Sequence, residues 1–154
     1  MKMHLTTAEA GCTINACGKN FVVIDGEQYK QSLLLLPGGV ILLPLPECVE
    51  ELTDTHLSAA VGYGYQTTEN QAASSAPVAS TEKFGVPEVF LLGAGEHSPM
   101  WRAEWLAPFA GVGVSLEVMS LSAACRTYNI MQADGRVAAA ILLMKTGGQD
   151  QAAP

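Results

Sequence analysis

Residues 120–144 read SLSAACRTYNIMQADGRVAAAILLM, and this stretch decides the fold. Ala124, Tyr128 and Met131 lie at positions i, i+4 and i+7, which is the spacing of one helix face. Thr127 and Ile130 widen that stripe. The first half of the stretch is therefore predicted to be an amphipathic helix whose apolar face packs on a core.

The ends of this helix also carry recognisable signals. Ser122 or Ser120 can cap its start, because a serine hydroxyl accepts a hydrogen bond from an amide two or three residues later. Asp134-Gly135 is expected to end it, with glycine in the left-handed conformation. The run 137–144 that follows is apolar without alternation, as in strands covered on both faces of an α/β sheet.

Composition excludes several classes of function. The net charge is −7, and the eight basic residues are scattered, so a nucleic-acid partner is not expected. Four cysteines without a C-x-x-C pair and three distant histidines predict no metal site, no cofactor and no disulfide framework. The greasiest segment, 33–45, is too short to cross a bilayer and contains Pro37-Gly38-Gly39. We expect a cytoplasmic protein without membrane insertion.

The N-terminal third is predicted to be a meander of antiparallel strands. Phe21 to Ile24 forms a strand that stops at the turn signal Asp25-Gly26. A second strand runs from Tyr29 to Leu36, and a third from Val40 to Leu43. A short helix, capped by Thr53 or Thr55, follows them.

The C-terminal half alternates strands and helices. Val89 to Leu92 is a buried strand that ends in Gly93-Ala94-Gly95. Ser98-Pro99 is expected to open a helix carrying Trp101, Trp105, Leu106 and Phe109, which Pro108 ends or kinks. Ser115 to Met119 is the next strand. This order predicts a largely parallel sheet with right-handed crossovers.

The chain is expected to form one domain. Residues 1–144 make a single α/β domain, residues 66–83 a mobile insertion, and residues 145–154 a disordered tail.

A candidate ligand site follows from this order of elements. In open α/β sheets, ligands bind beyond the carboxyl ends of the strands. If the glycine loop at 93–95 faces the first turn of the central helix, the following residues come within reach of a small anion: Gly93, Gly95, Cys125, Arg126, Thr127 and Asn129.

A purely structural interpretation of this corner stands beside the ligand-binding one. In it, the glycines allow close packing, and Arg126 pairs with Glu88 or Glu117. Cys125 is either a reactive thiol, activated by the helix start and the adjacent arginine, or a buried inert one. No catalytic residues are predicted, because Glu96-His97-Ser98 is better explained as a loop followed by a helix cap.

Several segments resemble a known family. These are AACRTYN at 123–129, GRVAAA at 135–140, GVSLEVM at 113–119, PEVFLLGAG at 87–95 and the run from Phe21 through Pro37. They resemble a family of unknown function that includes mitochondrial complex I (NADH dehydrogenase) assembly factor 3 and its bacterial and archaeal relatives. The chain departs from the family pattern at Ser120-Leu121, where relatives tend to have Asp-Thr, and it lacks an aromatic residue expected near Cys17.

The resemblance implies a three-layer α/β domain. It has a mixed, largely parallel central sheet, packed helices and an added N-terminal β-hairpin or meander layer. It also implies a non-catalytic interaction protein with a protein partner, one that assists assembly of a membrane or respiratory complex. The alternative is a protein, or a modest enzyme, that binds a small anionic ligand at the corner of Arg126, Gly93 and Gly95.

Overall fold

The computed structural model describes residues 11–65 and 85–145. The predicted insertion at 66–83, and the predicted tail apart from Lys145, lie outside the described residues.

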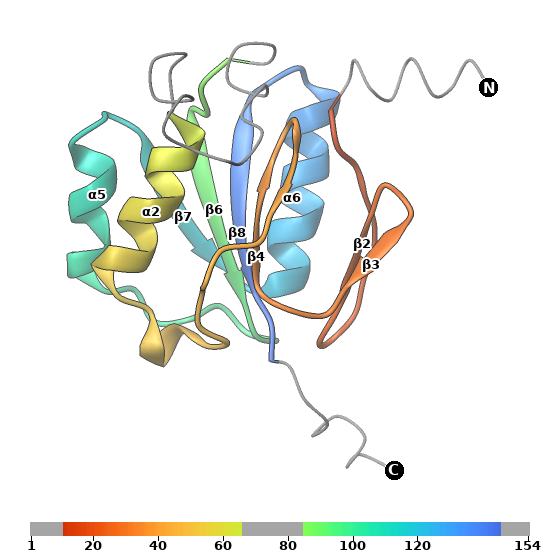
Figure 1. The fold of residues 1–154 in the computed structure, drawn as a ribbon, viewed down its shortest axis with the longest axis horizontal. Helices are drawn as coiled ribbons and strands as arrows, with labels where there is room; N and C mark the ends of the chain where they lie inside the picture. Colours follow the sequence, from red (N-terminus) through yellow and green to blue (C-terminus); the bar gives the residue numbers. More distant parts are fainter. Residues whose placement is uncertain (1–10, 66–84, 146–154) are drawn as a thin grey trace.

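Two sheets and three α-helices make up the described part of the chain (Figure 1). The central sheet has the strand order β5 (Gly39–Ile41), β4 (Leu33–Leu36), β8 (Ala138–Leu143), β6 (Val89–Ala94) and β7 (Ser115–Met119). A second, antiparallel sheet contains β1 (Ile14–Cys17), β2 (Val22–Ile24) and β3 (Glu27–Tyr29). The central sheet is mixed, since β6 runs parallel to β7 and β8, whereas β4 runs antiparallel to β5 and β8.

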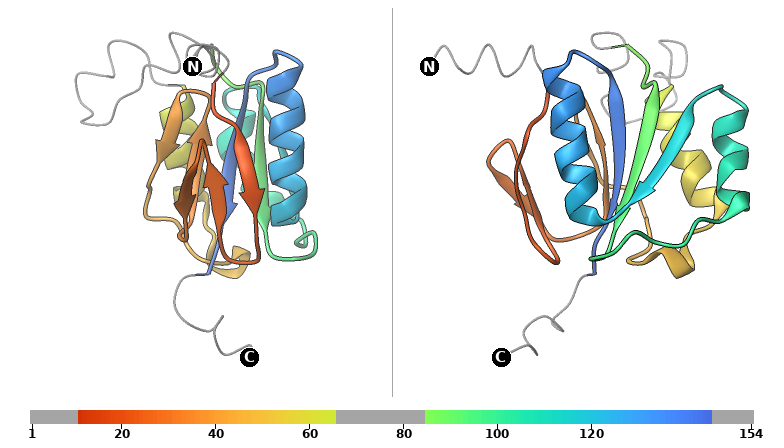
Figure 2. Two further views of the ribbon diagram at one scale, coloured as in Figure 1. Left: turned by 90° about the vertical axis from the view of Figure 1, so that its right-hand side faces the viewer. Right: turned by 180° about the vertical axis from the view of Figure 1, so that it is seen from behind.

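The helices lie on opposite faces of the central sheet (Figures 1 and 2). Helix α6 (Leu121–Ala133) covers one face together with the small sheet. Helices α2 (Asp54–Gly64) and α5 (Ala107–Ala110) cover the other. The three-layer α/β architecture expected from the sequence, with its added N-terminal β layer, is confirmed.

Burial on both faces explains why the inner strands lack polar alternation. Along β6, Val89 and Leu91 pack on the α6 side, whereas Phe90 and Leu92 pack on the α2 side. Every residue of β4, β6 and β8 is buried. A continuous apolar run is what such a doubly covered strand requires.

The expected helix caps are present. Ser120 is the N-cap of α6, and its hydroxyl accepts from the amide of Ala123 at 3.3 Å. Gly135 follows the helix with a φ of +77°, a conformation that glycine adopts without a Cβ clash. In α2, Thr53 forms a capping box with His56.

The expected strand from Tyr29 to Leu36 is wrong in one respect, because the chain changes sheets within it. Tyr29 ends β3, which pairs with β2, and Leu33 begins β4, which pairs with β8. Ser32 makes the transition, since its hydroxyl donates to the carbonyl of Pro46 at 2.8 Å and accepts from the amide of Met144 at 2.9 Å. The hydrophobic pattern continues across the break because both segments have buried residues.

The helix expected to begin at Ser98 is also wrong. Residues 98–102 are not helical, a 3-10 helix spans Ala103–Leu106, and α5 follows directly. The Ser98 hydroxyl donates to the carbonyl of Val118 at 3.5 Å instead of capping a helix. Pro108 does not end α5 but lies in its first turn, where its missing N–H has no helical partner to lose.

Within residues 11–65 and 85–145, no helix is long and apolar enough to cross a bilayer.

Candidate functional site

The carboxyl ends of β6, β7 and β8 lie at one rim of the central sheet, because these strands are parallel. The loop after β6 meets the start of α6 there, since the Leu121 amide donates to the Gly95 carbonyl at 2.9 Å. The glycine loop at 93–95 therefore faces the first turn of the central helix, as the sequence predicts. The six residues predicted for the corner nevertheless occupy different environments.

Gly93 is buried in β6 beneath α6. A Cβ on Gly93 would lie 2.5 Å from the Cβ of Ala124 and 3.3 Å from the Cα of Leu121. Its role in the structure is close packing of a strand against a helix. Of the two glycines, Gly95, which follows the strand, is the one that lies at the open rim.

Cys125, Arg126 and Thr127 point away from one another. Cys125 is buried, and burial is the main cause that raises the pKa of its thiol, which keeps the thiol protonated. Arg126 is exposed and forms no ion pair with any described residue. The expected pairing with Glu88 or Glu117 is therefore absent from the described residues, and Glu88 pairs with Arg136 instead. Thr127 borders a separate groove on the far side of α6.

Asn129 joins α6 to the small sheet. Its side-chain oxygen accepts from the amide of Ile14 at 2.9 Å, and its side-chain nitrogen donates to the carbonyl of Ile14 at 2.8 Å. Ile14 belongs to β1, an edge strand whose outer backbone groups have no strand partner among the described residues. An amide side chain is suited to this position because it offers one acceptor and one donor. A ligand-binding role for the six corner residues stays a prediction.

We expect Asn129→Ala to destabilise the fold by about 2 kcal/mol, because it leaves a part-buried N–H and C=O of Ile14 unpaired. Thermal and urea unfolding would measure this loss. Arg126→Ala is the matched control on the same helix, and we expect a change within about 0.5 kcal/mol for an exposed side chain. Equal melting temperatures for the two variants would contradict the structural role of Asn129.

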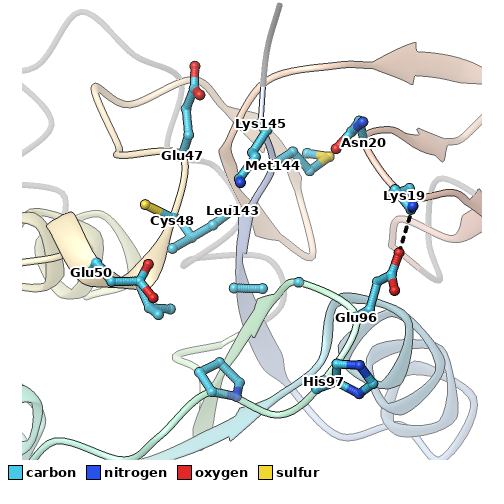
Figure 3. A pocket seen from close by; sticks show the side chains of 14 residues that line it. Lys19, Asn20, Glu47, Cys48, Glu50, Glu96, His97, Leu143, Met144 and Lys145 are labelled. Carbon is cyan, nitrogen blue, oxygen red and sulfur yellow. Dashed lines mark ion pairs between the residues drawn. The ribbon is translucent and has the colours of Figure 1, made fainter. Parts of the chain in front are cut away.

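A hollow of about 420 Å³ opens at the same rim, beyond the ends of β6 and β8 (Figure 3). Its apolar lining includes Ala94, Pro99 and Leu143. Its polar lining comes from three separate loops and the end of β8: Lys19, Asn20, Glu47, Cys48, Glu50, Glu96, His97 and Lys145. Sequence reasoning found the rim but missed most of these residues, because no local pattern brings Lys19 and Cys48 next to Gly95.

Charges of both signs line the hollow. Lys19 and Glu96 form an ion pair of 2.9 Å across one side of it (Figure 3). The hydrogen bond and charge of Lys19 lower the pKa of Glu96. Glu47 and Glu50 lie on the opposite side, and Lys145 lies between the two sides. A lining with three carboxylates and two ammonium groups does not favour a simple anion.

The thiol in this hollow is not activated. Burial raises the pKa of Cys48, and a hydrogen bond to the Glu50 carboxylate raises it further. A thiol held protonated is a weak nucleophile at neutral pH. Among the residues that the structure describes, no group of three or more His, Cys, Asp or Glu side chains is placed to hold a metal ion.

An apolar segment borders the hollow. Met100 is 84% exposed and Trp101 is 48% exposed, and they follow Pro99 directly. Arg102, the next residue, acts electrostatically on Glu50 inside the hollow. The segment therefore continues the surface of the hollow, and we call residues 99–102 together with the hollow the rim surface.

The comparison with family models agrees with the fold and rim just described. The model of a protein family of unknown function (DUF498/DUF598) matches residues 14–143, which include both sheets and all of the rim surface except Met144 and Lys145. This chain belongs to the DUF498/DUF598 family. A comparison with curated proteins found no match.

Solved structures similar to this DUF498/DUF598 chain share its architecture. A Bordetella pertussis protein described as a Mth938-like domain is 25% identical, with a TM-score of 0.68, and the alignment covers 94% of this chain and 92% of the other. A Bordetella parapertussis protein is 26% identical, with a TM-score of 0.63 and coverage of 88% and 97%. A Xanthomonas campestris protein at 22% identity and a TM-score of 0.62, with coverage of 90% of each chain, shows the same fold.

Proposed function

We propose that this protein is a non-catalytic interaction protein that binds a protein partner through the rim surface. The observation that carries the proposal is the exposure of Met100 and Trp101 beside a hollow of mixed charge. Exposed Met and Trp side chains are enriched at protein interfaces, where a few such residues supply most of the binding energy.

The mixed charges of the hollow support a protein partner over a small anion. Glu47 and Glu50 lie on one side of the hollow and the Lys19–Glu96 pair on the other, and apolar residues complete the lining. A protein surface can present apolar, acidic and basic groups together, and charge complementarity of this kind gives an interface its specificity. A lone anion would instead meet more carboxylates than ammonium groups.

An assembly role is the more specific form of this proposal. It rests on the resemblance of the AACRTYN and GRVAAA segments to a family that includes complex I assembly factor 3. The protein would bind a subunit of a membrane or respiratory complex while that complex forms, and it would carry out no reaction itself.

The binding surface is tested by affinity capture from the native host at endogenous expression level. We expect the double variant Met100→Ser/Trp101→Ser to recover the partner at least about tenfold less than wild type, since interface hot spots have effects of this size. Ile130→Ser is the matched control, because Ile130 is 60% exposed on α6 and lies outside the rim surface. Both variants should melt close to wild type.

Two results would contradict the binding proposal: equal recovery by the double variant, or no protein enriched above an untagged control. The assembly role is tested separately. A deletion strain should lose assembled respiratory complex on a native gel, and wild type and Ile130→Ser should restore it. A normal amount of assembled complex in the deletion strain would exclude the assembly role and leave the binding surface unaffected.

A further inference from the structure

Strand β1 runs antiparallel along α6, and side-chain hydrogen bonds set the register. Gln132 donates to the carbonyl of Cys12 at 3.1 Å, and Asn129 bonds both backbone groups of Ile14. Each step forward along β1 is therefore a step back along α6. Continued to the end of β1, this register places Cys17 beside Cys125 in the N-terminal part of the helix.

The packing of the two cysteines agrees with this register. Cys125 is buried in the core cluster that α6 and the small sheet form with one face of the central sheet, and Cys17 packs against the same cluster. Burial is the main cause that raises the pKa of Cys125, and the charge and hydrogen bonding of Cys17 raise it further.

The two cysteines differ in access to solvent. Cys17 is half-buried and lines a second hollow of about 300 Å³, which is also bordered by Gly95 and Ser122. Cys125 lies behind it with 4% exposure. A small oxidant can therefore reach Cys17 first, with Cys125 in position to react with the oxidised sulfur.

We propose that Cys17 and Cys125 are a modification site that forms a reversible intramolecular disulfide in the presence of a peroxide. In the first step, the Cys17 thiolate attacks one oxygen of the peroxide, the O–O bond breaks, and Cys17 becomes a sulfenic acid. The other oxygen departs as hydroxide, or as alkoxide from an organic peroxide, and takes up the proton that the Cys17 thiol released. In the second step, the Cys125 sulfur attacks the Cys17 sulfur, and the S–O bond breaks. The Cys125 thiol gives its proton to the departing hydroxide as its sulfur attacks, so the hydroxide leaves as water and no free Cys125 thiolate is required. For hydrogen peroxide, two thiols and one peroxide give one disulfide and two waters.

The other two cysteines are placed differently. Cys12 lies near Asp25, and burial together with that carboxylate raises the pKa of its thiol to about 12. Cys48 lies at the first hollow, where its thiol bonds to Glu50. The groups that shift these two pKa values are carboxylates and, for Cys48, backbone groups, and no other described cysteine is among them. The proposal therefore concerns one pair only, and it is independent of the proposed function.

The disulfide would join the small sheet to α6 covalently. Lys19 follows Cys17 by two residues and pairs with Glu96 at the rim. A crosslink that closes a long loop restricts the unfolded chain and stabilises the folded one. We expect the oxidised protein to melt about 5 °C or more above the reduced protein.

The test uses the full reduced chain, which contains four free cysteines. After treatment with hydrogen peroxide at mildly alkaline pH, the intact mass of the protein should fall by the mass of two hydrogen atoms. Alkylation of the treated protein should then modify only two of the four cysteines. A peptide map should join the peptides that contain Cys17 and Cys125. Dithiothreitol should restore four thiols. Cys17→Ser and Cys125→Ser should each abolish the bond, whereas Cys48→Ser should leave it intact.

A disulfide between any other pair of cysteines would overturn the proposal, and so would exclusively intermolecular crosslinks. Oxidation of Cys17 to a sulfinic acid while Cys125 remains a free thiol would also overturn it. If Cys125→Ser does not fold, the peptide map of the wild-type protein decides the question alone.

Discussion

Gly93→Ala is expected to destabilise the fold by about 3 kcal/mol, which lowers the melting temperature by roughly 6–12 °C. The added Cβ would lie 2.5 Å from the Cβ of Ala124 and 3.3 Å from the Cα of Leu121. Both atoms belong to or lie next to the backbone of α6, so neither can rotate away. The strand or the helix must move instead, and differential scanning calorimetry would measure the cost.

Two further variants separate this clash from other effects of the substitution. Ala124→Gly, added to Gly93→Ala, removes the nearest clashing carbon, and we expect the pair to recover part of the loss as a coupling energy. Gly62→Ala is the control. A Cβ at that helical position meets nothing within 4 Å, so we expect a gain of up to about 1 kcal/mol. A Gly93→Ala protein that melts with wild type would show that α6 does not lie this close to β6.

Trp105→Ala is the second large effect, and we expect a loss of about 4 kcal/mol. The Trp105 side chain is fully buried on the α2 side of the sheet, and the guanidinium of Arg102 lies 5.8 Å from the centre of its ring. Removing the indole leaves a large cavity in a part of the core that includes Phe109. Urea unfolding monitored by far-UV circular dichroism would measure the loss.

Trp101 provides a matched control on the same segment. The two indole rings lie 6.0 Å apart, but Trp101 is 48% exposed. Trp101→Ala should therefore cost less than about 1 kcal/mol of stability while weakening partner binding. Trp105→Phe should lose less than Trp105→Ala, since the buried indole N–H has no hydrogen-bond partner among the described residues. Equal stability losses at Trp101 and Trp105 would contradict the burial described above.

Much of the fold could be predicted from local sequence. Helix α6 has a serine cap, an apolar stripe and a glycine stop, and all three act within one segment. The buried strands β6 and β8 were predictable because an apolar run without alternation requires cover on both faces. Errors occurred where a distant element decides the conformation, as at Ser32, which bonds to Met144 and so directs β4 into the central sheet.

The segment from Ser98 to Phe109 shows the same limit. Its aromatic residues have roughly helical spacing, yet helical structure begins only at Ala103. Ser98 bonds to the carbonyl of Val118 on β7, and Met100 and Trp101 extend into solvent. The helical spacing of the aromatic residues predicts that they are buried, so the sequence did not predict the exposure on which the proposed function rests.

The candidate site was predictable as a place but not as a set of residues. Parallel strands put their carboxyl ends at one rim, so strand order alone locates a hollow there. Whether a side chain faces that hollow depends on its orientation and on loops from elsewhere in the chain. Asn129 faces β1 and Arg126 faces solvent. Lys19 reaches the hollow from a loop and Glu50 from a short 3-10 helix, and no motif marks either residue.

The sequence by itself determined the helix with its caps, the doubly buried strands, the α/β class and the family. These properties leave local signals, because backbone preferences, cap residues and the apolar pattern of a segment can be read within that segment. Only the tertiary structure decided where the chain changes sheets, which charges line the rim, that Met100 and Trp101 are exposed, and that Cys17 packs against the core cluster that contains Cys125. Such features depend on contacts between residues far apart in the chain, and no local pattern encodes those contacts.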